Sequence, residues 1–335
     1  MKSAGADEQG GARTPLISIV LPTCDRQHYL AETIGSIFGQ TLRDWELIIV
    51  DDGSGAQTRS YLETLQSFPK VRLIRLPHSG KPAVARNAGI REARGEYIAF
   101  MDSDGVWLPH KLECQLASLM QRADRGWSQT SFLFMDAVGN PLRYMPAADG
   151  WVFELLLCGE TVIALPSVLI SRSLLEEVGG FNETRVTSED YELWLRCALR
   201  SPVDAIPEPL TRVRCHQEHY GQPVGAVQNC LRVVDEFVDK GLTVGLESLV
   251  RRRRATLLAQ LARAHVISRQ RTRAFGVLFK DGASSCLYLP WWSALGVAIS
   301  ALAPSPARKL MRAIRAKVRS SAAERAEGTF ATRGR

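Results

Sequence analysis

Residues 45–54 read WELIIVDDGS. A short apolar, β-branched run that stops at two carboxylates and a glycine is typical of a strand buried on both faces, as in a parallel sheet. Similar runs occur at residues 16–22 (LISIVLP), 71–76 (VRLIRL) and 97–101 (YIAFM). The alternation of such strands with segments of helical spacing predicts an α/β fold built from βαβ units. The expected helices are at residues 29–39, 58–68 and 81–93.

Polar side chains follow three of these strands. They are Thr23-Cys24-Asp25, Asp51-Asp52 and Asp102-Ser103-Asp104. Ligands of parallel sheets bind at the carboxyl ends of the strands. Polar loops are common there, but clustered carboxylates repel one another unless a cation or a donor-rich ligand compensates them.

We expect the carboxyl edge of these strands to bind a diphosphate without a glycine-rich loop. The chain has neither GxGxxG after its first strand nor GxxxxGK[ST], so Rossmann and P-loop sites are excluded there. A divalent cation held by carboxylates is the remaining way to bind a diphosphate. Asp102-x-Asp104 offers the oxygen ligands that Mg²⁺ and Mn²⁺ prefer.

Five segments together resemble family 2 glycosyltransferases of the GT-A fold. They are ISIVLPTCDR (17–26), WELIIVDDGS (45–54), ARNAGIREARGEYIAFMDSDGVWLPHKL (85–112), PSVLISRSLLEEVGGFNE (166–183) and SEDYELWLR (188–196). Their order and spacing match the family over roughly residues 16–216. The resemblance implies a mixed, mostly parallel sheet flanked by helices. It also implies metal-dependent, inverting transfer of a sugar from a nucleotide-diphosphate sugar.

The resemblance also implies which residues form the site. The nucleotide-sugar would be bound by Pro22, Thr23, Asp25, Asp52, Arg86, Asn87, Asp102 and Ser103. Asp104 would be the direct ligand of Mn²⁺ or Mg²⁺, with Asp102 as a second ligand or a ribose contact. His216 is the candidate histidine near the metal, and His219 competes with it. Where relatives carry an aromatic residue that stacks on the base, this chain has Cys24.

Ser188-Glu189-Asp190 corresponds to the family's acidic motif, whose last aspartate is the general base. An inverting displacement needs a group that takes the proton of the attacking acceptor hydroxyl, and a carboxylate can do so. Without the resemblance, Ser188 would be a helix N-cap with two acids in the first turn. Arg86 also has an alternative, which is to pair only with a strand-end aspartate.

Charge is distributed unevenly along the chain. Residues 1–250 hold 24 basic and 32 acidic side chains, whereas residues 251–335 hold 18 basic and 3 acidic ones. Residues 282–307 carry no charge and include Pro290, which leaves a helix too short to span a bilayer. Residues 307–319 have the pattern of a basic amphipathic helix. We expect this extension to bind an anionic membrane surface, the alternatives being a buried helix or a solvated basic face. Nucleic acid is not expected, because no aromatic–basic interleaving accompanies the charge.

The expected organisation is a disordered leader at 1–15, a GT-A domain at 16–220 and a helical, basic, membrane-associating extension at 221–335. Further elements are expected at residues 161–171 (strand) and 172–178, 191–200, 227–242 and 246–267 (helices). Seven scattered cysteines without a CxxC pair favour a reducing compartment. The expected location is the cytoplasmic face of the cell membrane.

The expected donor is a UDP- or dTDP-sugar, and the expected acceptor is a lipid-linked or cell-envelope glycan. Two alternatives remain. A sugar-nucleotide nucleotidyltransferase would need a glycine- and arginine-rich loop after the first strand, which residues 22–26 do not form. The other alternative is a catalytically inactive, membrane-associated scaffold that binds sugar nucleotides.

Overall fold

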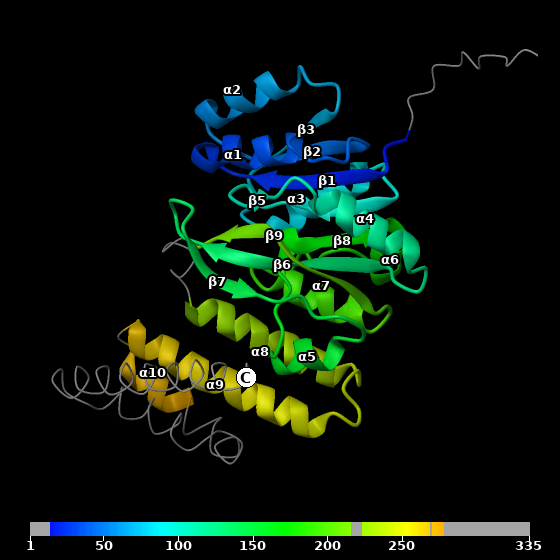
Figure 1. Cartoon of the computed structure of the whole chain (residues 1–335). Coiled ribbons are helices and arrows are strands. Elements are labelled where there is room, and N and C mark those ends of the chain that lie inside the picture. Colours follow the sequence, from blue (N-terminus) through cyan, green and yellow to red (C-terminus); the bar gives the residue numbers. More distant parts are fainter. Residues whose placement is uncertain (1–13, 216–222, 269, 278–335) are drawn as a thin grey trace, which may run out of the picture. The chain divides into compact units, whose positions relative to one another are not determined.

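The computed structural model describes residues 14–215, 223–268 and 270–277 (Figure 1). The strands are β1 (Ile17–Thr23), β2 (Trp45–Asp52), β3 (Val71–Leu76), β4 (Tyr97–Phe100), β5 (Val106–Trp107), β6 (Trp127–Met135), β7 (Pro141–Met145), β8 (Val168–Ser171) and β9 (Val203–Arg214). The helices are α1 (Gln27–Phe38), α2 (Ala56–Leu65), α3 (Pro82–Glu92), α4 (Lys111–Gln121), α5 (Phe153–Cys158), the 3₁₀ turn η1 (Leu165–Ser167), α6 (Arg172–Val178), α7 (Glu189–Ala198), α8 (Pro223–Asp239), α9 (Glu247–Ile267) and α10 (Arg271–Gly276).

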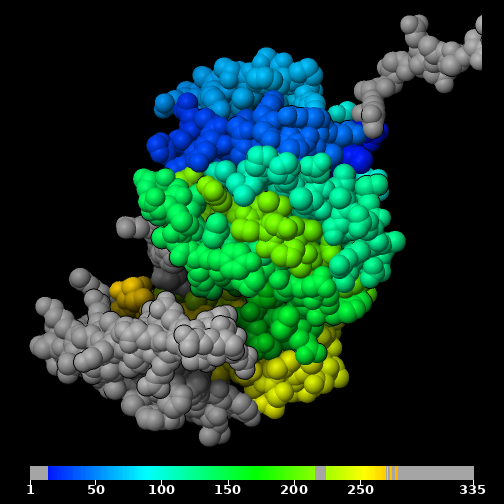
Figure 2. All heavy atoms as spheres, viewed as in Figure 1, coloured from blue at the N-terminus to red at the C-terminus, as the bar shows by residue number. Residues whose placement is uncertain are grey.

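The chain divides into two compact units, residues 1–242 and 243–335. The first contains every described element from β1 to α8, and Figure 2 shows the atoms from β1 to β9 as one continuous body. In the second, α10 packs against α9. The domain boundary expected near residue 220 and the membrane association of residues 221–335 stay predictions. No helix of residues 14–215, 223–268 and 270–277 is long and apolar enough to cross a membrane.

The described strands of the first unit form one mixed sheet. Its order is β3-β2-β1-β4-β8-β6-β9-β5, with β7 paired to β6. The four strands β3, β2, β1 and β4 are mutually parallel, and β6 and β9 form another parallel pair. Because parallel neighbours end at the same edge, this order brings the polar ends of β1, β2 and β4 together, as the sequence predicts.

The central strands are apolar on both faces because helices cover both. Along β1, Ile19 and Leu21 join a core cluster with residues of α1 and α4. Val20, between them, faces the opposite side, where α3 packs. Alternate side chains of a strand point to opposite faces, so a continuous apolar run buries both.

Gly89 sets the distance between α3 and the sheet. A Cβ atom at this position would lie 2.5 Å from Val20 Cγ1 and 3.2 Å from Val50 Cγ2. A β-branched valine has little rotamer freedom with which to move away. The glycine therefore allows the helix to lie directly on β1 and β2, which places Arg86, one turn earlier, at the carboxyl ends of the strands.

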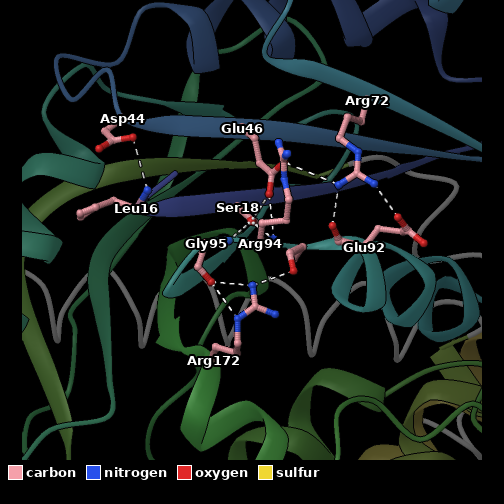
Figure 3. Close-up of polar contacts among 10 residues, drawn as sticks. Leu16, Ser18, Asp44, Glu46, Arg72, Glu92, Arg94, Gly95 and Arg172 are labelled. Atoms are coloured by element: carbon pink, nitrogen blue, oxygen red, sulfur yellow. Dashed lines mark hydrogen bonds and ion pairs between the residues drawn. The ribbon is translucent and has the colours of Figure 1, made fainter. Parts of the chain in front are cut away.

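A dense polar network closes the opposite, amino edge of the parallel strands (Figure 3). The buried Glu46 carboxylate accepts hydrogen bonds from Ser18 Oγ at 2.7 Å and from Arg94 N, Nε and Nη2 at 2.8–3.0 Å. Arg72 lies 3.7 Å from the same carboxylate and also pairs with Glu92. Burial would raise the pKa of Glu46, but the Arg94 and Ser18 hydrogen bonds outweigh it, and the pKa lies below its ordinary value.

Two sequence expectations are corrected here. The strand expected at residues 161–171 is only β8 (Val168–Ser171), because Pro166 lies in the 3₁₀ turn η1 that precedes it. Ser188 does precede α7, with Glu189 and Asp190 in the first turn, but its side chain caps no helix N–H. Its backbone is left-handed (φ 63°) and its hydroxyl lies 3.4 Å from Cys230 Sγ.

Candidate functional site

A cavity of about 600 Å³ opens at the carboxyl edge of the parallel strands. Its lining includes seven residues that the sequence assigned to nucleotide or metal: Pro22, Thr23, Asp52, Arg86, Asp102, Ser103 and Asp104. The other basic side chains at this cavity are Arg26, Lys81 and Arg214. Carboxylates and cations around one hollow suit a ligand that is itself anionic and is bound with a metal ion.

Arg86 is the central group of the site. Its guanidinium is 8% exposed and donates to Glu189 at 2.5 Å and to Asp102 at 2.9 Å. Its charged face also lies 5.5 Å from the ring centroid of Phe181. Arg86 therefore links the Asp102-Ser103-Asp104 segment to the acidic motif at the start of α7, and the two residues that it binds, Asp102 and Glu189, are 87 positions apart in the chain. Arg86 does pair with the strand-end Asp102, but it also pairs with Glu189 and lines the cavity, so that pairing is not its only contact.

Asp190 lies beside this link. Burial raises the pKa of its carboxyl to about 6, with the negative charge of Glu189 adding to the effect. Arg86 and the hydrogen bond from Tyr191 N, at 2.8 Å, act in the opposite direction. A carboxylate with a pKa near neutral holds a proton well enough to accept one and loses it readily, which is the property of a general base.

The pKa of Asp102 is also raised, first by burial and then by Asp104, against the lowering influence of Arg86. Three carboxylates, Asp102, Glu189 and Asp190, thus lie around one buried guanidinium, and the charge of Asp104 acts on Asp102. Such an excess of negative charge favours a further cation.

Among the described residues, no three His, Cys, Asp or Glu side chains lie close enough to one another to hold a metal ion by themselves. Mg²⁺ and Mn²⁺ often take only one or two carboxylates and complete their coordination with water and substrate phosphate. Asp102 and Asp104 line one cavity and fit such a site. Thr23 Oγ1, also at this cavity, is buried without a hydrogen-bond partner in the described part of the chain.

Backbone strain is concentrated at the site. Among the described residues, Asp25 (φ 49°) and Ser188 (φ 63°) are the non-glycine residues with positive φ. Asp25 follows β1 and its carboxylate accepts from Gly55 N at 2.8 Å. Ser188 comes two residues before Asp190. Such strain persists where the surrounding structure requires the conformation, and it is common at functional sites.

Three residues that the sequence assigned to the site are not in the cavity lining. They are Asp25, Asn87 and Asp190. Of these, Asp190 still interacts with Arg86, which does line the cavity. Asn87 holds the loop after α6, since its Nδ2 donates to Phe181 O at 2.8 Å and its Oδ1 accepts from Phe181 N. Its role in donor binding stays a prediction. His216 lies outside the described residues.

Arg214 is a site residue that the sequence did not reveal. Its guanidinium, 2% exposed, donates to Asp104 O at 3.1 Å and to Glu32 at 2.5 Å, and it lies 4.6 Å from the ring centroid of Tyr29. It therefore fixes the backbone of Asp104 from β9. Arg214 comes two residues before the candidate His216 in the sequence, but no local signal distinguishes it from Arg212.

Comparisons with known proteins identify the family and the fold. A family model described as glycosyl transferase family 2 matches residues 18–137. TuaG of Bacillus subtilis (strain 168), a glycosyltransferase whose name assigns it to teichuronic acid biosynthesis, is 33% identical over 184 residues. The match covers 54% of this chain and 71% of TuaG. This chain belongs to glycosyltransferase family 2.

A second relative of this family 2 glycosyltransferase is WfgD of Escherichia coli. It is 31% identical over 198 residues, which cover 57% of this chain and 73% of WfgD. WfgD is named UDP-Glc:α-D-GlcNAc-diphosphoundecaprenol β-1,3-glucosyltransferase.

The fold is GT-A. The mannosyltransferase PcManGT of Pyrobaculum calidifontis, solved with GDP-Man and Mn²⁺, superimposes with a TM-score of 0.58 at 17% identity. The superposition covers 87% of this chain and 86% of PcManGT. The expected family, fold class and enzyme class are therefore confirmed.

Proposed function

We propose that this family 2 glycosyltransferase is metal-dependent and inverting, and that it transfers a sugar from a UDP- or dTDP-sugar to a lipid-linked or cell-envelope glycan. One observation carries the proposal. Arg86, which lines the cavity, joins the Asp102-Ser103-Asp104 segment to the Glu189-Asp190 pair. This arrangement supports a cation site for the donor and a base for the acceptor within one cluster.

Each residue has a role in the proposed reaction. Asp104, with Asp102, would hold Mn²⁺ or Mg²⁺, which when bound neutralises charge on the departing diphosphate. Arg26 and Lys81 line the same cavity, and in this reaction they would bind diphosphate oxygens. The acceptor oxygen bonds to the anomeric carbon as the bond to the diphosphate breaks, and the electron pair leaves with the diphosphate. Asp190 takes the acceptor proton.

The relatives support the donor and acceptor classes. WfgD is named for UDP-Glc as donor and for a diphosphoundecaprenol-linked sugar as acceptor, and TuaG for the synthesis of teichuronic acid. PcManGT, with only 17% identity, was solved with GDP-Man, so a guanine donor is the main alternative to be tested.

The metal site is tested by Asp104→Ala. Wild-type protein should bind UDP or dTDP more tightly with Mn²⁺ than without it, and the variant should lose this enhancement, as measured by calorimetry. Asp124→Ala removes an aspartate that is 73% exposed and should behave like the wild type. Mn²⁺-enhanced binding that persists in Asp104→Ala would refute the assignment.

The proposal includes association of the extension with the cytoplasmic face of the membrane. Its support is compositional: residues 251–335 have 15 more basic than acidic side chains, and the apolar run 282–307 adjoins a basic amphipathic pattern. The run and the amphipathic pattern lie outside the described residues. The full chain should sediment with anionic vesicles, less so at high salt because salt screens charge. A chain lacking residues 282–335 should stay in the supernatant. If the full chain also stays there at low salt, the membrane proposal fails.

A further inference from the structure

His78 is placed at the far end of the cavity from the carboxylate cluster. It follows β3, whereas Asp102 and Asp104 follow β4, and the strand order between them is β3-β2-β1-β4. The loop turns back over the sheet, so that the ring lies against the ends of β2 and β1, where it meets Asp52 O and Cys24 Sγ. Neighbouring strands lie about 4.8 Å apart, so the ring is one to two strand spacings, roughly 5–10 Å, from the end of β4. That separation is comparable to the distance between the base and the diphosphate of a nucleoside diphosphate. If the diphosphate lies at the carboxylate end, its base lies at the His78 end.

The loop that carries His78 is held by Asp52. The Asp52 carboxylate accepts from Ser79 N at 2.9 Å with one oxygen and from Gly80 N at 3.0 Å with the other. Gly53 lies beneath the loop, since its φ is +77° and a Cβ atom there would lie 2.7 Å from His78 N and Cβ. Asp52 is buried and already bonded, so it positions this loop.

The hydrogen bond to Asp52 O determines the tautomer of the His78 imidazole. His78 Nδ1 lies 2.8 Å from Asp52 O, and a backbone carbonyl can only accept, so Nδ1 carries the proton. In the neutral ring Nε2 is then an acceptor. The side chain is 62% exposed, lines the cavity, and contacts Cys24 Sγ at 3.7 Å. The burial of Cys24 and the nearby Asp25 and Asp52 charges raise the pKa of its thiol, so Cys24 offers a neutral surface beside the ring.

We propose that His78 is a specificity-determining residue for the donor nucleotide. Its imidazole forms the wall against which the base lies, and its Nε2 accepts the ring N–H of uracil or thymine. Cytosine presents an acceptor at the same ring position, so two lone pairs would face each other. The inference rests on the proposed function and adds to it the group that selects the base.

The test is calorimetry of the full chain with Mn²⁺ and UDP, dTDP or CDP. Wild-type protein should bind UDP and dTDP roughly tenfold more tightly than CDP, as expected for one hydrogen bond. His78→Phe keeps a ring and removes the acceptor, so the preference should fall to within about twofold. His78→Ala also removes the ring and should weaken all three nucleotides by roughly tenfold. His110→Phe is the matched control, because His110 is 63% exposed and lies at the start of α4.

The contrary outcomes are distinct from one another. If His78→Phe keeps the wild-type preference, or weakens all three nucleotides equally, His78 does not select the base, while the proposed function stands. If wild-type protein binds UDP, dTDP and CDP equally, the inference is also wrong. If wild-type protein shows no Mn²⁺-enhanced binding of any nucleoside diphosphate, the proposed function itself fails and the inference fails with it.

Discussion

The two edges of the parallel strands differ in the balance of their buried charges. At the amino edge, one buried carboxylate, Glu46, is surrounded by Arg94, Arg72 and Ser18 (Figure 3). At the carboxyl edge, one buried guanidinium, Arg86, is surrounded by carboxylates. In the first arrangement the negative charge is compensated by its partners, and the pKa of Glu46 is lowered. The second has excess negative charge, and the pKa values of Asp102 and Asp190 are raised.

This difference separates a structural edge of the sheet from an edge suited to binding a ligand. A buried charge with compensating partners has no need of a ligand. A cluster with more carboxylates than cations is stabilised by a ligand or metal ion that brings positive charge. Binding at such a cluster is therefore coupled to the ionisation of its carboxyl groups. The two edges should then respond oppositely to substitution and to pH.

The largest expected effect is that of Asp190→Asn at the carboxyl edge. The amide keeps the size of the side chain but cannot take a proton, so turnover should fall by roughly 10²–10⁴-fold. Donor affinity should change little, because the base acts on the acceptor. Steady-state kinetics and calorimetry measure the two quantities. Near-normal turnover would transfer the role to Glu189, and absent turnover in the wild type would favour the inactive scaffold.

A smaller effect, with a definite direction, is expected for Arg86→Met. Wild-type turnover should rise with pH through about 6, where Asp190 loses its proton. Because the Arg86 charge lowers that pKa, its removal should move the rising limb to higher pH and reduce the maximum by roughly 10–10²-fold, since Glu189 and Asp102 lose their shared partner. Arg86→Lys should bring the limb part of the way back. A limb that stays in place or moves to lower pH would contradict this account of the site.

The smallest effect on activity is expected for Glu46→Gln. Turnover should stay within about twofold of the wild type, while the free energy of unfolding should fall by about 1–3 kcal/mol at neutral pH. The lowered pKa of Glu46 means that its ionised form stabilises the fold above the ordinary carboxyl pKa, and that this stabilisation is lost as pH falls through the lowered value. Urea unfolding should therefore show a difference that shrinks in acid.

The matched control at this edge is Glu92→Gln. Glu92 is 53% exposed and pairs with the same Arg72. Its substitution should cost at most about 1 kcal/mol, as for other exposed pairs. The interpretation of the amino edge as a purely structural network would be wrong in either of two cases. One is that Glu46→Gln lowers the free energy of unfolding no more than Glu92→Gln does, and the other is that it reduces turnover as Arg86→Met does.

The sequence predicts the parallel half of the sheet well, because strands such as β2 and β3 are continuous local patterns bounded by turns. It does not predict β6 or β9, whose register is set by pairing between residues some 80 positions apart. At the site, Asp102 and Asp104 follow from a strand end and a resemblance. Arg214 and His78 do not, because each acquires its place only through a tertiary contact, with Asp104 O and with Asp52 O.

The close approach at Gly89 has a consequence for anyone who surveys this enzyme by random mutagenesis. Replacement by alanine adds one methyl group that would press on Val20, and the helix would have to lift from the sheet. Arg86, on the same helix, would be displaced from Glu189 and Asp102. Such a clone would score as inactive although the altered position touches neither donor nor acceptor. A map of substitutions that abolish activity would thus mark Gly89, whose side chain is a single hydrogen atom, as strongly as the carboxylates of the site.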